Sequence, residues 1–143
     1  MLKVKQIKNI LKNYYTIFRL ERSAEILATS TADEITRSLA LRDFKKYGQK
    51  TNRGCAKRRQ IAFKGVIEVV EKTLEEVDDL CKACVTNLLF KGKTPVYVEM
   101  HYYISESTQR RLLDHFIGEI FMGIIWDKKA TNHFKETCKY LKL

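Results

Sequence analysis

Apolar residues recur along most of the chain at intervals of three and four positions, which is the spacing of one face of an α-helix. The longest such pattern runs from Ala56 to Phe90 and predicts one continuous helix. Its apolar seam consists of Phe63, Ile67, Val70, Leu74, Val77, Cys81, Cys84 and Leu88. A seam of this kind requires a second helix to cover it, from the same chain or from another copy. The pattern therefore predicts an all-α helical bundle.

Two shorter helices are predicted before it, and together they make residues 1–47 an N-terminal helical segment. The first, residues 1–27, has an apolar stripe of Ile7, Ile10, Leu11, Tyr14 and Phe18. The sequence from Thr29 to Asp33 breaks the pattern, and Thr31 or Asp33 is the expected cap of the next helix. That second helix has the apolar positions Ile35, Leu39 and Phe44. We expect both stripes to pack in the core.

Residues 94–112 contain two helix starts at the separation that a helix-turn-helix needs. Thr94 is a candidate N-cap, and Pro95 suits the first helical position, where the missing N–H costs nothing. A turn at Tyr103–Ile104 leads to Ser105, whose hydroxyl can cap the second helix. The spacing therefore favours a helix-turn-helix, although an ordinary helical hairpin with a solvated charged face has the same pattern.

The phase of the second helix separates an inner and an outer face. The inner face gathers Gln109, Leu112, Leu113, Phe116 and Ile120, and the outer face presents Ser107, Arg110, Arg111 and Asp114. Two arginines near a helix N-terminus suit DNA, because the guanidinium has five donors and the helix end favours phosphate. The candidate recognition residues are Ser105, Ser107, Thr108, Gln109, Arg110 and Arg111, and the candidate backbone contacts beside them are Lys91, Lys93 and Thr94.

A short motif in this region resembles a known family. Ile104-Ser-Glu-Ser-Thr-Gln-Arg-Arg-Leu112 resembles the "I-S-x-x-T-V-x-R" start of the recognition helix in sigma-factor region 4. With the preceding Leu88-Leu89-Phe90 and Lys91-Gly92-Lys93, it is similar to the ArpU/RinA-type phage regulators of late transcription, over about residues 56–125. The chain departs from the pattern at Glu99, where a small residue is usual, and at Gln109, where Val is usual.

The resemblance has implications for fold and function. It implies that residues 60–143 form a sigma-region-4-like helix-turn-helix domain. It further implies a phage or prophage late-gene activator that binds double-stranded DNA and acts with the RNA polymerase of a bacterial host.

Residues 48–59 are predicted to form a basic loop between the two domains. From Lys45 to Arg59 the chain has seven basic residues, two glycines and no acidic residue. Such a stretch is either a solvated linker or a segment that lies on the DNA backbone and neutralises phosphates. Its candidate backbone contacts are Lys57, Arg58 and Arg59.

The overall charge agrees with a nucleic-acid partner. Lys and Arg number 27 against 17 Asp and Glu, which gives a formal net charge of +10. An anionic membrane surface would also attract this charge, but the basic faces lack the Trp/Leu stripe of an interfacial helix. The chain has neither a long apolar run nor a signal-peptide pattern, so we expect no membrane and a cytoplasmic location.

The four cysteines are expected to be reduced core thiols rather than metal ligands. Cys81 and Cys84 have the spacing of half a zinc site, but no second pair completes a tetrahedron, and both lie on the apolar seam. No Gly-rich phosphate loop, activated nucleophile or metal-spaced carboxylate pair is present, so we expect no enzyme and no cofactor. The alternative to a DNA-binding regulator is a non-enzymatic helical protein-interaction module with a basic surface.

The last part of the chain is strongly apolar. Paired apolar residues recur every four positions from Leu112 to Ile125, so this helix should be buried on two sides, by the N-terminal helix and the 56–90 helix. Trp126 is expected to close its end, and Asn132 to cap a last short helix. So much apolar surface in a short chain, together with the gain from binding two half-sites, favours a homodimer on DNA.

Overall fold

The computed structural model describes residues 2–29 and 31–143, and every regular element in that part of the chain is a helix. Met1 and Ser30, at the start of the predicted first helix and in the predicted break after it, lie outside the described residues. The elements are α1 (Val4–Lys12), α2 (Tyr14–Ala28), α3 (Glu34–Lys46), α4 (Arg53–Glu76), α5 (Asp79–Cys84), the π-helix η1 (Val85–Phe90), α6 (Pro95–Tyr102), α7 (Glu106–Ile125) and α8 (Lys128–Leu141). The predicted all-α fold class is confirmed.

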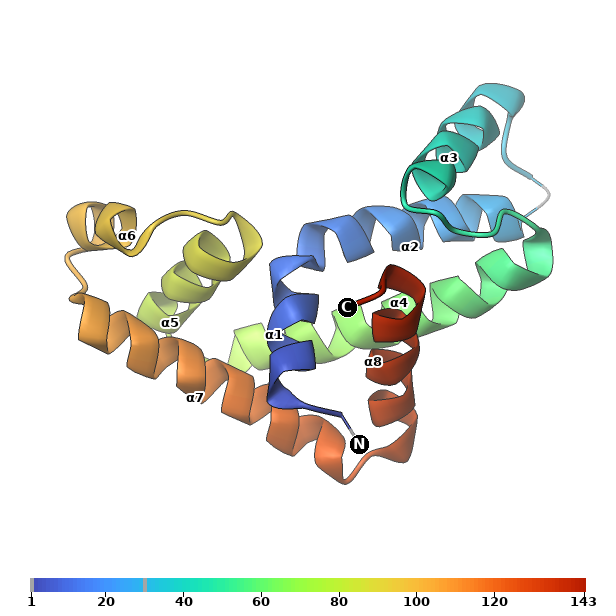
Figure 1. Ribbon diagram of the computed structural model, residues 1–143. Coiled ribbons are helices and arrows are strands. Elements are labelled where there is room, and N and C mark those ends of the chain that lie inside the picture. Colours follow the sequence, from blue (N-terminus) through green and yellow to red (C-terminus); the bar gives the residue numbers. More distant parts are fainter. Residues whose placement is uncertain (1, 30) are drawn as a thin grey trace.

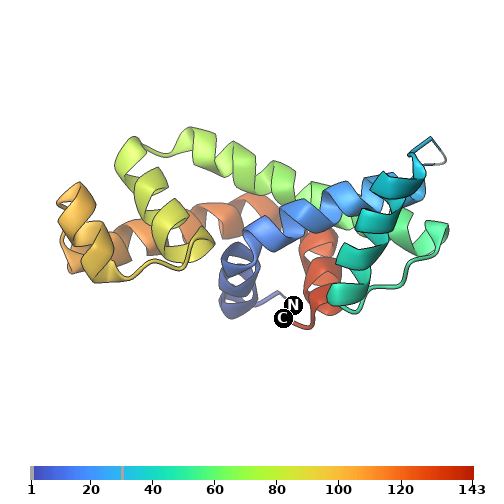
Figure 2. The ribbon, with the colours of Figure 1, turned by 90° about the horizontal axis from the view of Figure 1, so that it is seen from above.

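The helices form a large lobe and a small lobe (Figure 1). In the large lobe α2 and α4 lie side by side, α3 packs on α2, and α8 packs on α4. The small lobe consists of α5, η1, α6 and the start of α7. The rest of α7 leaves the small lobe and packs against α1, α4 and α8 (Figures 1 and 2). One long helix therefore belongs to both lobes.

The prediction of one continuous first helix is wrong, because the chain bends at Asn13 and forms two helices, α1 and α2. The Asn13 side-chain amide donates a hydrogen bond to the Asn9 carbonyl at 2.8 Å, and such a bond competes with the backbone pattern of a continuing helix. After the bend Ile17 faces the core, whereas Phe18 is 40% exposed. The predicted apolar stripe is thus confirmed as far as Tyr14 and wrong at Phe18.

α3 follows Asp33, one of the two predicted caps, whose carboxylate accepts a hydrogen bond from a first-turn N–H at 2.8 Å. Because α3 packs chiefly on α2, only its face with Ala40 and Phe44 is buried. Ile35 and Leu39 are 76% and 53% exposed. The prediction that these two residues pack in the core is therefore wrong.

The predicted continuous helix Ala56–Phe90 is also wrong, because the chain breaks at Val77 and Asp78, between α4 and α5. Val77 is extended, with ψ of 160°, and the Asp78 carboxylate caps α5 by accepting a hydrogen bond from the Cys81 N–H at 2.8 Å. The predicted seam residues are nevertheless all buried or half-buried. They pack against helices of the same chain, so the seam is covered without a second copy.

α4 begins at Arg53, earlier than predicted. The Asn52 side chain accepts a hydrogen bond from an N–H of the first turn at 2.9 Å, which satisfies a donor that the helix itself leaves free. Residues 48–52 form a loop, but residues 53–59 are helical. The predicted basic loop is therefore too long, and its three candidate DNA contacts lie on a helix.

The second half of α7 packs against both α1 and α4, as predicted, although Ile125, the last of the paired apolar residues, is 43% exposed. Trp126, which was expected to close its end, is 87% exposed. α8 starts directly after Asp127, whose carboxylate accepts a first-turn N–H at 3.1 Å, so the predicted cap at Asn132 is wrong. α8 crosses α4 where Gly65 lacks a Cβ, and the His133 ring occupies the space.

Candidate nucleic-acid interface

α6 and α7 begin at the two helix starts predicted from the sequence, Thr94 and Ser105. The Thr94 hydroxyl accepts a hydrogen bond from the Tyr97 N–H at 3.1 Å, and the Ser105 hydroxyl accepts one from the Thr108 N–H at 3.4 Å. Both predicted caps are therefore confirmed. Between them Tyr103 adopts the left-handed conformation, with φ of 57°, and ends α6.

Gln109 holds this turn closed from the inside. Its side-chain amide donates hydrogen bonds to the Pro95 carbonyl at 3.0 Å and to the Ile104 carbonyl at 2.9 Å, and it is only 1% exposed. The bonds join the first residue of α6 to the turn that leads into α7. Gln109 is thus a buried positioning residue, and its side chain does not reach the surface that would meet DNA. This geometry also shows what glutamine does at a position where the resembling family usually has valine.

The outer face of α7 is exposed as its phase predicted. Ser107, Arg110 and Arg111 are all exposed, whereas Thr108 is half-buried and its hydroxyl accepts hydrogen bonds from Ser105 at 2.9 Å and from Arg111 at 3.5 Å. Ser105 and Thr108 therefore build the helix start. The side chains directed away from the protein are Ser107, Arg110 and Arg111.

A cleft of about 260 Å³ lies where α1 meets the start of α7 and the loop before α6. Four cations line it: Lys8 and Lys12 of α1, Lys93 of the loop, and Arg110 of α7. Glu106 is the one carboxylate among the described residues that line the cleft. This combination gives the face a positive potential that suits phosphate groups.

Lys8 and Lys12 were not among the predicted site residues. Their spacing of four places both on the polar face of the first helix, which was the signal available in the sequence. What the sequence does not show is the contact of α1 with η1 and α7, because that contact depends on the bend before Tyr14. The Tyr14 ring stacks on Phe90 of η1 with centroids 4.5 Å apart, and so fixes α1 beside the small lobe.

The loop between η1 and α6 is ordered by backbone hydrogen bonds. The Lys91 N–H donates to the Thr86 carbonyl at 2.9 Å, and the Lys93 N–H donates to the Asn87 carbonyl at 2.7 Å. Lys91 and Lys93 are exposed, and the Lys93 ammonium lies 5.0 Å from the centroid of the Tyr97 ring. Lys93 therefore lies beside the start of α6, whereas Lys91 is exposed but does not line the cleft.

The other predicted backbone contacts lie elsewhere. Lys57, Arg58 and Arg59 are in the first two turns of α4, whereas the small lobe follows the opposite end of that helix. A helix of 24 residues is about 36 Å long, so the three side chains do not join the cluster around Arg110. Their contact with DNA stays a prediction.

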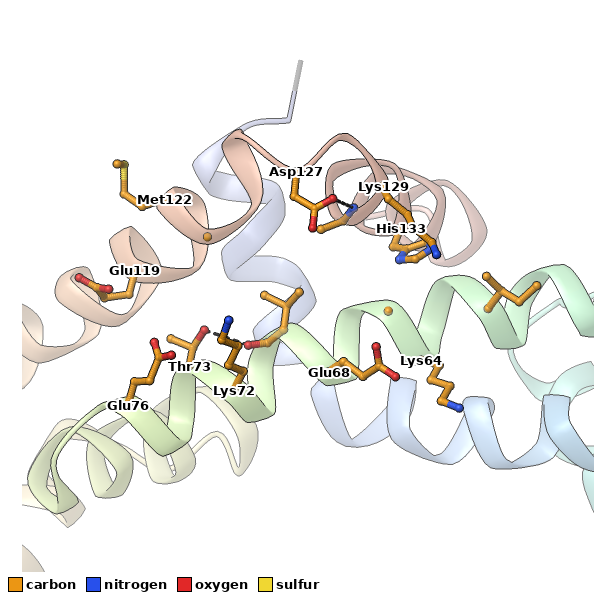
Figure 3. Close-up of a pocket in the computed structure, with 15 residues that line it drawn as sticks. Lys64, Glu68, Lys72, Thr73, Glu76, Glu119, Met122, Asp127, Lys129 and His133 are labelled. Carbon is orange, nitrogen blue, oxygen red and sulfur yellow. Dashed lines mark hydrogen bonds between the residues drawn. The ribbon is translucent and has the colours of Figure 1, made fainter.

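A groove of about 680 Å³ between α4, α7 and α8 differs in its charge (Figure 3). The α4 side of the groove alternates positive and negative side chains at helical spacing: Lys64, Glu68, Lys72 and Glu76. Glu119, Asp127 and Lys129 add charges of both signs from the other two helices. A mixed lining of this kind has no preference for a polyanion.

The cysteines lie in the protein interior, as predicted for core thiols. Cys81 and Cys84 are 2% and 0% exposed, and burial raises the pKa of the Cys81 thiol to about 11. In residues 2–29 and 31–143, no three His, Cys, Asp or Glu side chains are arranged to hold a metal ion.

Comparison with protein-family models, with curated proteins and with solved structures finds no match for this chain. The likeness to sigma region 4 thus rests on the short motif from Ile104 to Leu112. Among the described residues, no helix combines the length and apolar character needed to cross a bilayer.

Proposed function

We propose that this chain is a sequence-specific DNA-binding protein that reads the major groove with the start of α7. The observation that carries the proposal is the convergence of Arg110 with Lys8, Lys12 and Lys93 around one cleft, where Glu106 is the single carboxylate among the described residues of the lining. The lysines neutralise backbone phosphates and set the position of the protein on the duplex. Arg110 and Arg111 then present bidentate donors to the O6 and N7 acceptors of guanine.

In this proposal α6 and α7 act as a sigma-region-4-like helix-turn-helix, with Gln109 in place of the usual apolar contact. The resemblance of the Ile104–Leu112 motif extends the proposal to biology. The protein would activate late genes of a phage or prophage together with the RNA polymerase of the bacterial host, in the host cytoplasm.

Homodimer formation on DNA is part of the proposal. Because the seam of α4 and α5 is covered within the chain, the argument from uncovered apolar surface loses its force. A dimer is supported by a different argument. Two arginines discriminate between few base sequences, and binding to two half-sites about one helical turn apart would increase the specificity. Light scattering with and without a bound duplex measures the copy number.

An alternative is supported by the outer face of α6. Val96, Met100 and Tyr103 are 61%, 70% and 91% exposed, and their spacing places them along one side of the helix and its end. Exposed apolar side chains that gather in this way are typical of a protein contact. A helical protein-interaction module would use this face, and its basic surface would then serve solubility only.

Selection of bound fragments from a random duplex library separates the two functions. The proposal predicts enrichment of one sequence motif, and a binding constant for that motif that exceeds the constant for random duplex by about a thousandfold or more. Binding that is equally weak on all sequences would rule out sequence-specific reading, and an absence of binding at low salt would support the interaction module. The symmetry of the enriched motif also reports whether one or two half-sites are read.

A further inference from the structure

A second concentration of positive charge lies at the end of α4 that is remote from the small lobe. It lines a pocket of about 360 Å³ between the loop before α4, the first turns of α4 and the end of α8. The cations of the pocket are Lys50, Arg58, Arg59, Lys139 and Lys142. No Asp or Glu is among the described residues that line it.

Arg59 is held in place by neutral groups. Its Nε donates a hydrogen bond to the Gln49 side-chain oxygen at 2.7 Å, and its guanidinium lies 4.3 Å from the centroid of the Tyr140 ring. Gln49 is itself 6% exposed, and its amide donates to the carbonyls of Tyr47 at 2.9 Å and Tyr140 at 2.8 Å. The guanidinium is therefore fixed, and its charge is not neutralised by these contacts.

The start of α4 adds to the unbalanced charge. Its first turn has no acidic residue, although the N-terminal end of a helix carries a partial positive charge and disfavours cations. Arg58 donates a hydrogen bond to the Cys55 sulfur at 3.3 Å. A hydrogen bond from Asn52, together with the charges of Arg58 and Arg59, holds the pKa of the Cys55 thiol below its ordinary value. The cations and the helix end thus give the pocket a positive potential, which favours the binding of an anion.

We propose that this pocket is a binding site for a phosphate-bearing anion. Arginine forks match phosphate oxygens in geometry, and the surrounding lysines match the charge of a compact polyphosphate. The volume of the pocket is at the lower end of the range for small-molecule sites, about 300–1,000 Å³, which favours one or two phosphate groups over a larger ligand. The phosphate belongs either to a free anion or to a nucleic-acid strand. The site is independent of DNA reading by α7.

Titration calorimetry of the full chain with tripolyphosphate at low ionic strength tests the site. The test variant is Arg58→Gln with Lys139→Gln, which removes two lining cations and leaves the held Arg59 intact. The matched control is Lys64→Gln with Lys135→Gln, because these exposed residues lie on the same two helices and do not line the pocket. Each lost charge-assisted hydrogen bond lowers affinity by about tenfold, so the test variant should bind at least tenfold more weakly than the control.

The outcomes are distinct. No binding of tripolyphosphate to the wild-type chain, or an equal loss in test and control variants, overturns the proposal. A selective loss in the test variant supports it, provided that circular dichroism shows the same helix content in both variants. An Arg110→Ala variant keeps the binding of tripolyphosphate, so failure of DNA reading by α7 does not affect this result.

The source of the phosphate is found by repeating the titration with saturating duplex DNA. If the duplex displaces tripolyphosphate, the pocket holds a phosphodiester of the DNA strand. If both bind together, the ligand is a free phosphate anion. Either result supports a phosphate site at the start of α4.

Discussion

The large lobe and the α6 part of the small lobe are stabilised by different interactions. A cluster of 27 buried apolar residues runs through the large lobe and extends into α5 and η1. Among the described residues, the contact that holds α6 has three such residues, Cys84, Val98 and Ile104. Its geometry depends instead on hydrogen bonds from Gln109 and on the caps before α6 and α7.

The difference shows that the stability of the fold and the exact position of α6 relative to α7 depend on different interactions. Apolar burial contributes most of the folding free energy but has no direction, whereas hydrogen bonds fix the relative position of two backbones. The part of the small lobe around α6 therefore has a well-defined turn on a small apolar contact. Regions with few buried apolar contacts open most readily, and binding elements are often found in such regions. The lobe that carries the candidate DNA contacts is the one expected to open first.

The largest effect is expected from a cavity in the large lobe. Phe63→Ala removes a fully buried ring and should lower the free energy of unfolding by about 3–5 kcal/mol. Urea unfolding followed by circular dichroism measures the loss. Ile61→Ala, two positions away and 50% exposed, is the control and should change little. Similar losses in the two variants would show that the apolar cluster does not dominate the stability of this lobe.

The next effect concerns the small lobe alone. Gln109→Ala leaves the carbonyls of Pro95 and Ile104 without their donor, which should destabilise the α6–α7 turn by about 2–3 kcal/mol. Hydrogen exchange should accelerate at amides of α6 and remain unchanged at amides of α2. Ser107→Ala, an exposed neighbour, is the control. Equal acceleration in both lobes would mean that they unfold as one unit.

A third prediction separates the discrimination between DNA sequences from the stability of the folded protein. Arg110→Ala and Arg111→Ala should each reduce discrimination between cognate and random duplex by about 1–3 kcal/mol, because a bidentate contact to guanine is lost. The unfolding free energy should not change, since both side chains are exposed. Fluorescence anisotropy measures binding to both duplexes, and Arg22→Ala with Arg42→Ala in the large lobe is the control. Wild-type discrimination in both test variants would exclude α7 as the reading helix.

The smallest effect is expected from the lysines of α1. Lys8→Gln with Lys12→Gln should weaken binding equally on cognate and random duplex, and should reduce the slope of log affinity against log salt by about two. Lys64→Gln with Lys72→Gln, on the mixed-charge groove, is the control with the same change in charge. An unchanged slope in a salt titration of the α1 variant would remove α1 from the interface.

Local signals in the sequence were sufficient for the small lobe and insufficient for the large one. Thr94 and Ser105 could be identified as caps because each precedes a helix start with the right spacing, and the outer position of Arg110 followed from helical phase. Asn13 was missed, because an asparagine that bends a helix has the same apolar neighbours as one on a straight helix. Asp78 was missed for the same reason, since the apolar seam continues across the break.

The candidate site was predicted only in part. The helical phase of residues 105–120 was enough to place Gln109 on the inner face of α7. Its two hydrogen bonds depend on the distance between α6 and α7, and the spacing of residues in the sequence does not give that distance. Lys8 joins Arg110 through tertiary contacts between α1 and α7, and no local pattern encodes them.

α7 is a single helix that connects the two lobes. With 20 residues it is about 30 Å long, and it carries Arg110 near one end and the buried Ile120 and Ile124 near the other. A straight helix resists bending, so any tilt of its outer end on a ligand must be matched by repacking at the inner end. We therefore expect substitutions at the buried Ile124 to change the orientation of Arg110, although the two side chains lie near opposite ends of the helix.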